Sequence, residues 1–437
     1  MGIEADSAAV GGSPLVPREP WWRKLTLAGP GLVFVLSIVG PRDLVANSVA
    51  GSEFGYSLIW LLAVAIATRI AILESTARYV IVTGESLVTG CGKAGRWLVW
   101  MIFGVPLVKR FITGMVQLAL LGEAGHLLYP LSTPHSEVIW ALGSWFAAFA
   151  VLYFGRYKLV EKISQPLGFL LVGSLAIAAF LSKPDWSAAV KGTFVPSVPE
   201  ADSLYGASLV VLSVAMGAIG SIGNIKYAAF VHEKGWRDLS YLRSQRIDLV
   251  LSACGMFVML ALIQIAAAGA LHPLGIQVAE VADLVPVFAQ VLGGAGRVVL
   301  ALGVWCVVFT SVTGSATAYA LTLSDIYHRF LYPSDAIREQ DEGRGAAYLP
   351  AFRPFLVLFA IAPLMVLFTD WKPVPLLMAT ALVAAVMLPA TIVVLLRLTT
   401  DRKFMGDHVN GWLTNTVLVF AATAALYLGY EGVMEMF

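Results

Sequence analysis

Gly40-Pro41-Arg42-Asp43 interrupts an apolar segment that runs from about Leu25 to Phe54. A second apolar segment, from about Leu204 to Trp236, is interrupted by the glycine-rich stretch GAIGSIG at 217–223. Proline has no amide donor and clashes with the preceding helical turn, and glycine weakens a helix interior. Both segments are therefore predicted to be helices that break near their middle.

The composition is typical of a membrane protein, and this decides how the two breaks are interpreted. Of the 437 residues, 58% are hydrophobic and 13% are charged, whereas soluble domains carry about 25% charged residues. Backbone groups inside a bilayer must be hydrogen-bonded within the protein, so a broken helix is tolerated only where it lines a cavity. Two broken helices at matching positions of two halves indicate the substrate site of a transporter.

Apolar runs of about 18 or more residues predict eleven membrane spans. A further short helix at 280–292 is predicted to lie at the membrane surface. The spans are expected at 25–54, 57–82, 97–128, 137–154, 158–182, 204–234, 246–271, 293–327, 351–370, 374–398 and 411–434.

Lysine and arginine predict the orientation of these spans in the plasma (inner) membrane, because cytoplasmic loops are enriched in both. With the N-terminus in the cytoplasm, the outer loops hold only Lys183, Lys191 and Lys372, and the other loops hold many more. The C-terminus is then expected outside. Residues 1–24 are predicted to be a disordered cytoplasmic tail rather than a signal peptide.

Spans one to five (25–182) and six to ten (204–398) form two sets of five, and residues 411–437 add an eleventh helix. An odd number of spans per set inserts the second set upside down. The predicted fold is therefore all-α, with a five-plus-five inverted repeat in which helices 1 and 6 are the broken ones.

The two breaks supply the predicted substrate site. A break frees carbonyl groups that bind cations and amide groups that bind anions. Asp43 is the one tentative metal ligand, and the alternatives are that it carries a coupling proton or pairs with Arg42. Lys226 either faces the cavity or extends toward the cytoplasm. The candidate substrate-binding residues are Gly40, Arg42, Asp43, Asn47, Gly217, Gly220, Ser221, Asn224 and Lys226.

Charged residues elsewhere in the spans predict a polar network beside this site, because such residues are expensive in a membrane. Its members are Glu53, Glu74, Lys109 and Arg110, with Arg69 nearby. Either they carry protons, which are the candidate coupling ion, or they form a structural cluster. Glu74 and Arg78 are four residues apart and can pair on one helical face.

Several motifs resemble the NRAMP family of transporters: Gly29-Pro30-Gly31, Thr83-Gly84-Glu85 and the stretch from Ala50 to Trp60, AGSEFGYSLIW. The resemblance implies a LeuT-type fold and secondary transport of divalent metals such as manganese, iron or magnesium. The family's metal-binding Asp-Pro-Gly-Asn is replaced here by Gly40-Pro41-Arg42-Asp43. Its Ala-Met-Pro-His motif in span 6 is replaced by the glycine-rich stretch. This pattern suggests an atypical bacterial branch of the family with an altered metal site.

Three functions follow as hypotheses. The first is divalent-cation transport through an altered site, and the second is transport of a small organic anion or zwitterion held by Arg42 and Lys226. The third is a membrane sensor that keeps the fold without transporting. The sequence contains no catalytic triad, nucleotide loop or zinc motif, so neither enzyme activity nor a cofactor is predicted. A net charge of +1 predicts no nucleic-acid partner. Cys91, Cys254 and Cys306 are expected to be buried free thiols.

Overall fold

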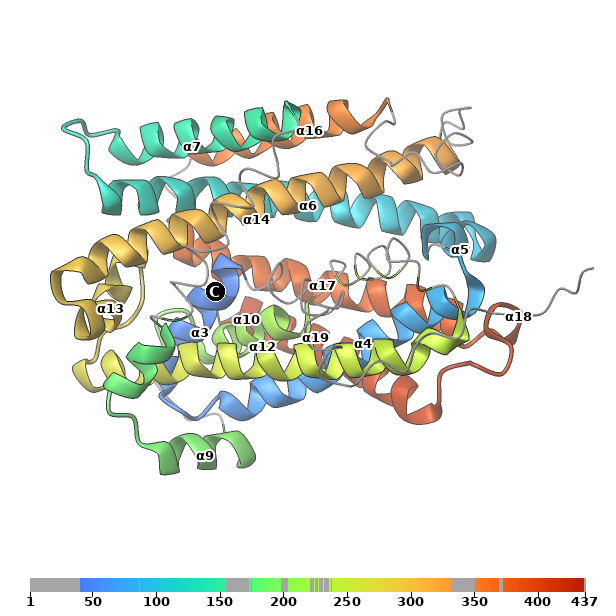
Figure 1. Ribbon diagram of the computed structural model, residues 1–437, viewed down its shortest axis with the longest axis horizontal. Coiled ribbons are helices and arrows are strands. Elements are labelled where there is room, and N and C mark those ends of the chain that lie inside the picture. The colour runs from blue at the N-terminus through green and yellow to red at the C-terminus, as the bar shows by residue number, and fades with distance from the viewer. Residues whose placement is uncertain are drawn as a thin grey trace, which may run out of the picture.

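The computed structural model describes residues 40–85, 87–154, 173, 175–197, 203–220, 224, 227, 231, 236, 238–331, 350–368 and 372–435. The described residues form helices and connecting turns, without β-strands (Figure 1). Seven of these helices contribute spans long and apolar enough to cross a membrane. They are α4 (Ile59–Thr83), α6 (Arg96–Leu128), α7 (Ser136–Tyr153), α12 (Leu242–Ala270), α14 (Gly296–Ile326), α17 (Pro373–Thr399) and α19 (Trp412–Met434).

Shorter helices complete the described chain. They are α3 (Pro41–Phe54), α5 (Leu87–Ala94), α9 (Trp186–Phe194), α10 (Ala207–Ile219), α13 (Val285–Leu292), α16 (Phe352–Ile361) and α18 (Arg402–Met405). The 3-10 and π turns are η2 (Leu239–Tyr241), η3 (His272–Leu274), η4 (Val281–Leu284), η5 (Gly293–Ala295), η6 (Tyr327–Leu331) and η8 (Ala362–Phe368).

Seven of the eleven predicted spans are confirmed as long helices, and the short helix expected at 280–292 appears as η4 and α13. The ninth span appears as α16 followed by η8. Residues 1–39, most of the fifth span and most of 221–237 lie outside the described residues. The total of eleven spans, the predicted division of the chain and the inverted repeat therefore stay predictions.

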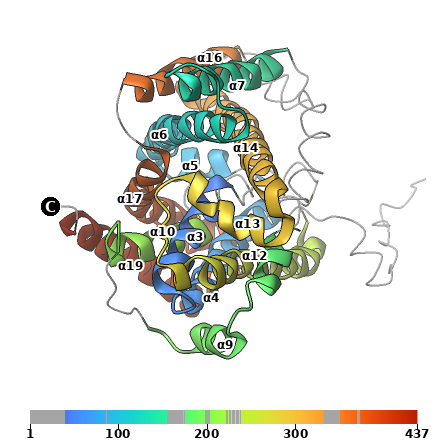
Figure 2. The same cartoon turned by 90° about the vertical axis from the view of Figure 1, so that its left-hand side faces the viewer.

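The helices form two groups, which Figure 2 shows from one end. Helices α6, α7, α14 and α16 pack together in one group, and α3, α4, α10 and α12 pack together in the other. Helices α17 and α19 lie against α10. The two broken segments thus contribute α3 and α10 to the same group, where they contact each other and α17.

Loops predicted to share one side of the membrane do lie at one end of the molecule. In Figure 1, α5 and α18 lie at one end, and α13 lies at the other. Lys93 on α5 and Lys403 on α18 both belong to loops predicted to be cytoplasmic. Which end faces the cytoplasm remains a prediction from the distribution of basic residues.

Helix α3 is almost completely enclosed, since all its residues except Arg42 are buried. It packs closely on α12 at Gly51, where an added Cβ would lie 2.3 Å from the Gln264 carbonyl oxygen. A side chain at this position would collide with backbone, which cannot move as a flexible side chain does. Gly51 therefore sets the separation of α3 and α12.

Glu435, near the end of the chain, binds the first turn of α10. The Glu435 carboxylate accepts hydrogen bonds from the Ser208 amide, at 2.9 and 3.2 Å. First-turn amides of a helix have no partner within the helix, and the N-cap residue of α10, Gly206, offers no side chain. Glu435 therefore caps α10 from the end of α19.

The expectation of three buried cysteines is wrong at one position. Cys91 and Cys306 are buried, but Cys254 is exposed on the outer side of α12. An apolar run shows that a helix crosses a membrane but not which of its faces meets lipid, so burial of a single thiol does not follow from it.

We predict that Gly51→Ala lowers the thermal unfolding midpoint in detergent, because overpacking a tight helix contact costs about 1–3 kcal/mol. Gly104→Ala is the matched control, since nothing lies within 4 Å of an added Cβ there. Alanine favours a helix over glycine by about 1 kcal/mol, so the control should be neutral or stabilising. Equal midpoints for the two variants would contradict the close packing of α3 and α12.

Candidate functional site

Two helix ends meet at the two predicted breaks. Helix α3 begins at Pro41, and Gly40 before it has an extended backbone, with φ −116° and ψ −176°. Helix α10 ends at Ile219, where Gly220 has φ +71°, in the region that favours glycine. Each predicted break thus coincides with a helix end. Whether helix continues before Gly40 or after Gly220 lies outside the described residues.

Asp43 lies in the first turn of α3 and points one carboxylate oxygen at α10. Its Oδ2 accepts a hydrogen bond from the Gly40 amide at 3.0 Å and so caps the helix. Its Oδ1 is buried and has no hydrogen-bond partner. An added Cβ on Gly217 would lie 2.8 Å from this oxygen. The absence of a side chain at Gly217 therefore leaves room for Oδ1 beside α10.

Arg42 passes close to Gly217, where an added Cβ would lie 4.0 Å from its Cδ. Its guanidinium donates a hydrogen bond to the Thr380 hydroxyl on α17. The positive charge still acts on Asp43 across a short distance, and Tyr319 on α14 interacts with it electrostatically. Thr380 had no signal in the sequence, because threonine is common in membrane helices.

Arg69 on α4 is the most informative residue that sequence reasoning misplaced. It was expected in a network with Glu74, but its Nη1 donates to the Ala218 carbonyl oxygen at 3.0 Å and contacts Met256 Sδ at 3.3 Å. Its side chain is buried, and it interacts electrostatically with Asp43. A second guanidinium therefore belongs to the site.

Two asparagines reinforce the helix ends. The Asn47 amide donates to the Asp43 carbonyl at 2.7 Å, and its buried Oδ1 has no partner. The Asn224 amide donates to the Ile219 carbonyl at 3.0 Å. Asn224 also lies against Gly220, where an added Cβ would be 2.8 Å from its Oδ1. Ser221 and Lys226 lie outside the described residues.

Glu53 lies at the opposite end of α3, about 15 Å from Asp43 at about 1.5 Å per residue. It accepts hydrogen bonds from the Ser203 hydroxyl at 2.6 Å and the Leu204 amide at 3.3 Å. It therefore ties the end of α3 to the segment that leads into α10. The contacts do not join it to the other residues expected in the polar network.

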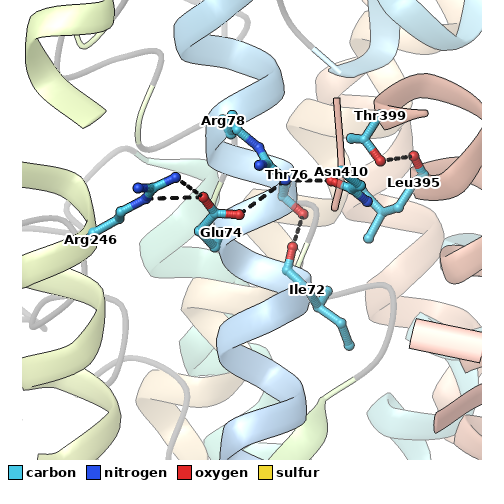
Figure 3. A network of polar contacts seen from close by, with 8 residues as sticks. All are labelled: Ile72, Glu74, Thr76, Arg78, Arg246, Leu395, Thr399 and Asn410. Carbon is cyan, nitrogen blue, oxygen red and sulfur yellow. Dashed lines mark hydrogen bonds and ion pairs between the residues drawn. The ribbon is translucent and has the colours of Figure 1, made fainter. Parts of the chain in front are cut away.

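Figure 3 shows a second cluster, centred on Glu74. Glu74 pairs with Arg78 on its own helix at 3.2 Å, as the four-residue spacing predicts, and with Arg246 on α12 at 2.9 Å. Arg78 also donates to the Asn410 side chain, which lies between α18 and α19. The cluster connects α4, α12 and the α18–α19 connection.

Arg110 belongs to a third cluster, on α6. It is fully buried and donates to Gln117 at 2.9 Å, and Gln117 donates to Ser311 on α14 at 2.9 Å. The rings of Trp145 and Phe359 lie 5.7 and 5.6 Å from its guanidinium carbon. Lys109 is half-buried on the same helix. Glu53, Glu74 and Arg110 thus have different hydrogen-bond or ion-pair partners.

The site offers oxygen atoms of the kind that hard cations bind: Asp43 Oδ1, Asn47 Oδ1 and the last carbonyl groups of α10. Among the described residues there is no group of three or more His, Cys, Asp or Glu that could hold a metal ion. The two guanidiniums nearby oppose cation binding. The arrangement suits a weakly held hard cation better than a soft transition metal.

We predict that Gly217→Val blocks substrate binding while the protein remains folded, because the side chain would collide with Asp43 Oδ1, which lies 2.8 Å from the position of an added Cβ. Binding and uptake should both fall at least about tenfold. The control is Gly143→Val, where an added Cβ meets nothing within 4 Å. Normal uptake by a folded Gly217→Val protein would show that the surroundings of Gly217 are not part of the binding site.

We predict that Glu74→Gln lowers stability by about 1–3 kcal/mol, since it leaves the mostly buried Arg78 without its carboxylate. Arg246→Gln should change stability by less than about 1 kcal/mol, because the Arg246 side chain is 56% exposed. Unfolding midpoints measure both effects. If Glu74→Gln kept its midpoint but lost proton-dependent uptake, the proton-carrying alternative would replace the structural one.

Comparison with known proteins identifies the family. The family model described as natural resistance-associated macrophage protein-like (Nramp) matches residues 31–435. A divalent metal cation transporter MntH of Granulibacter bethesdensis is 25% identical over 95% of this chain and 89% of its own length. The MntH of Bacillus subtilis is 22% identical over 89% of this chain and 88% of its own.

Solved structures agree on the fold. A crystal structure of the Eremococcus coleocola manganese transporter superposes with a TM-score of 0.73 at 19% identity, covering 94% of this chain and 86% of that one. Mhp1, a nucleobase-cation-symport-1 family transporter, superposes with a TM-score of 0.57 at 12% identity, covering 93% and 92%. The chain is an all-α integral membrane protein with this transporter fold, and it belongs to the NRAMP family.

Proposed function

We propose that this chain is a secondary transporter that moves a hard divalent cation, such as Mg²⁺ or Mn²⁺, through the space between α3 and α10. The observation that carries the proposal is the buried, unpartnered Oδ1 of Asp43 opposite Gly217. The relatives named divalent metal cation transporters support the substrate class. Asp43, Asn47 and the carbonyl groups of α10 would supply the ligand oxygens.

The altered break supports hard over soft ions. Gly40 and Gly217 contribute no side chain, and the break holds neither methionine nor histidine between Gly217 and Asn224. Carboxylate, amide and carbonyl oxygens suit magnesium and manganese, whereas thioether and imidazole ligands favour softer metals. The usual metal ligands of the family are thus largely replaced, and binding is expected to be weak.

An alternative substrate is a small organic anion or zwitterion. The observation that favours it is the pair of guanidiniums, Arg42 and Arg69, which flank the single carboxylate of Asp43. The first-turn amide groups of α3 would add to an anion site. Direct comparison of metals and carboxylates separates the two substrate classes.

Protons are the proposed coupling ion, and Asp43 is the proposed carrier. Glu53 and Glu74 hold hydrogen bonds and ion pairs away from the break, whereas Asp43 has a free oxygen within it. A carboxylate that binds either a metal or a proton would couple the two.

We predict that proteoliposomes containing this protein accumulate Mg²⁺ or Mn²⁺. A lower pH outside the vesicles should change the rate of metal uptake. Asp43→Ala should abolish uptake, because it removes the one carboxylate in the break. Asp407→Asn, at an exposed position, is the control.

The same vesicles should be tested with small carboxylates such as acetate and succinate. Carboxylate uptake without metal uptake would replace the cation proposal with the anion alternative. Metal uptake that survives Asp43→Ala would remove Asp43 from the site.

A further inference from the structure

We propose that the guanidinium of Arg69 is a tethered cation that competes with the substrate for its place and must be displaced for a divalent cation to bind. Arg69 would then determine both the affinity and the selectivity of the site. The inference deepens the proposed function and rests on it for the identity of the competing ion.

The hydrogen-bond partner of Arg69 is the first reason. Ala218 lies in the last turn of α10, where carbonyl groups have no amide partner further along the helix. These groups form the negative end of the helix, which favours positive charge. Arg69 Nη1 donates to the Ala218 carbonyl at 3.0 Å. The guanidinium therefore uses an oxygen that would otherwise be available to a metal ion.

Electrostatics is the second reason. Asp43 interacts with both Arg69 and Arg42. Arg42 donates its hydrogen bond to Thr380, whereas Arg69 donates to the helix that Asp43 Oδ1 faces across Gly217. Arg69 is thus the guanidinium that shares with a substrate both the carbonyl end of α10 and the Asp43 charge.

Burial is the third reason. Arg69 is 4% exposed, and a buried charge needs compensating partners. Arg69 is the eleventh of the 25 residues of α4, so its guanidinium cannot extend to the membrane surface as that of an arginine at a helix end does. Removing its partners without replacing them would be costly, which keeps the guanidinium in the site when no substrate is bound.

The consequence is competition between two cations for one set of oxygens. Asp43 and Arg69 carry opposite charges that offset each other. A divalent ion would add two positive charges beside a fixed one, unless Arg69 moves away from α10. Arg69 therefore weakens metal binding in the resting protein and would favour its release.

The test measures Mg²⁺ and Mn²⁺ binding to the purified full-length chain by calorimetry, with wild type, Arg69→Gln and Arg69→Met. We expect both variants to bind one of these metals at least about tenfold more tightly, since removing a nearby like charge is worth about 1.4 kcal/mol or more. Arg69→Gln combined with Asp43→Asn should lose the gain. Arg353→Gln, an exposed arginine on α16, is the matched control.

A second readout covers the case in which the variants are less stable. Metal that binds only the folded state raises the unfolding midpoint. The metal is added at about 1 mM, a concentration suited to weak sites. The rise in the unfolding midpoint with Mg²⁺ or Mn²⁺ should be larger for Arg69→Met than for wild type. Equal or smaller rises, together with unchanged or weaker calorimetric affinity, would overturn the inference.

The outcomes also separate this inference from the proposed function. Wild type that transports metal, with no gain in the variants, overturns only the role of Arg69. Wild type without metal transport, with variants that gain binding, supports the role of Arg69 and overturns cation transport as the function. No metal binding by any of the proteins overturns both.

Discussion

The structure depends on a single constraint: a helix that ends inside a membrane leaves backbone groups that lipid cannot satisfy. At the start of α3, the Asp43 side chain accepts the Gly40 amide. At the end of α10, Arg69 and Asn224 donate to the Ala218 and Ile219 carbonyls. The polar side chains of the site are thus the same side chains that make the two helix ends tolerable.

This double role explains why the site carries more charge than a helix kink needs. Backbone amides and carbonyls can be satisfied by neutral groups, as Asn224 shows. Asp43 and Arg69 bring full charges instead, at a cost that burial makes substantial. Charges held at such cost in the middle of a span are functional candidates, and here one of them keeps an oxygen without a partner.

The sequence predicted the spans well because long apolar runs, helix-breaking residues and family motifs are local signals. Helix α3 begins inside the break predicted at 40–43, and α10 ends inside the break predicted at 217–223. The partners of Arg69 and Arg42 were not predictable, because they lie on α10 and α17, far away in the sequence. Glu53 and Glu74 were assigned to one network for the same reason. A charged residue in an apolar run indicates that a partner is needed, but it does not indicate which helix provides that partner.

The contact between Glu435 and Ser208 links the last helix to the one that ends at the site. A tilt of α10 that opened or closed the space beside Gly217 would pull on this contact and carry the end of α19 with it. Tyr430, exposed on the outer surface of α19, offers a position for a spectroscopic label. Movement deep inside the protein would in this way be observable at its exposed surface.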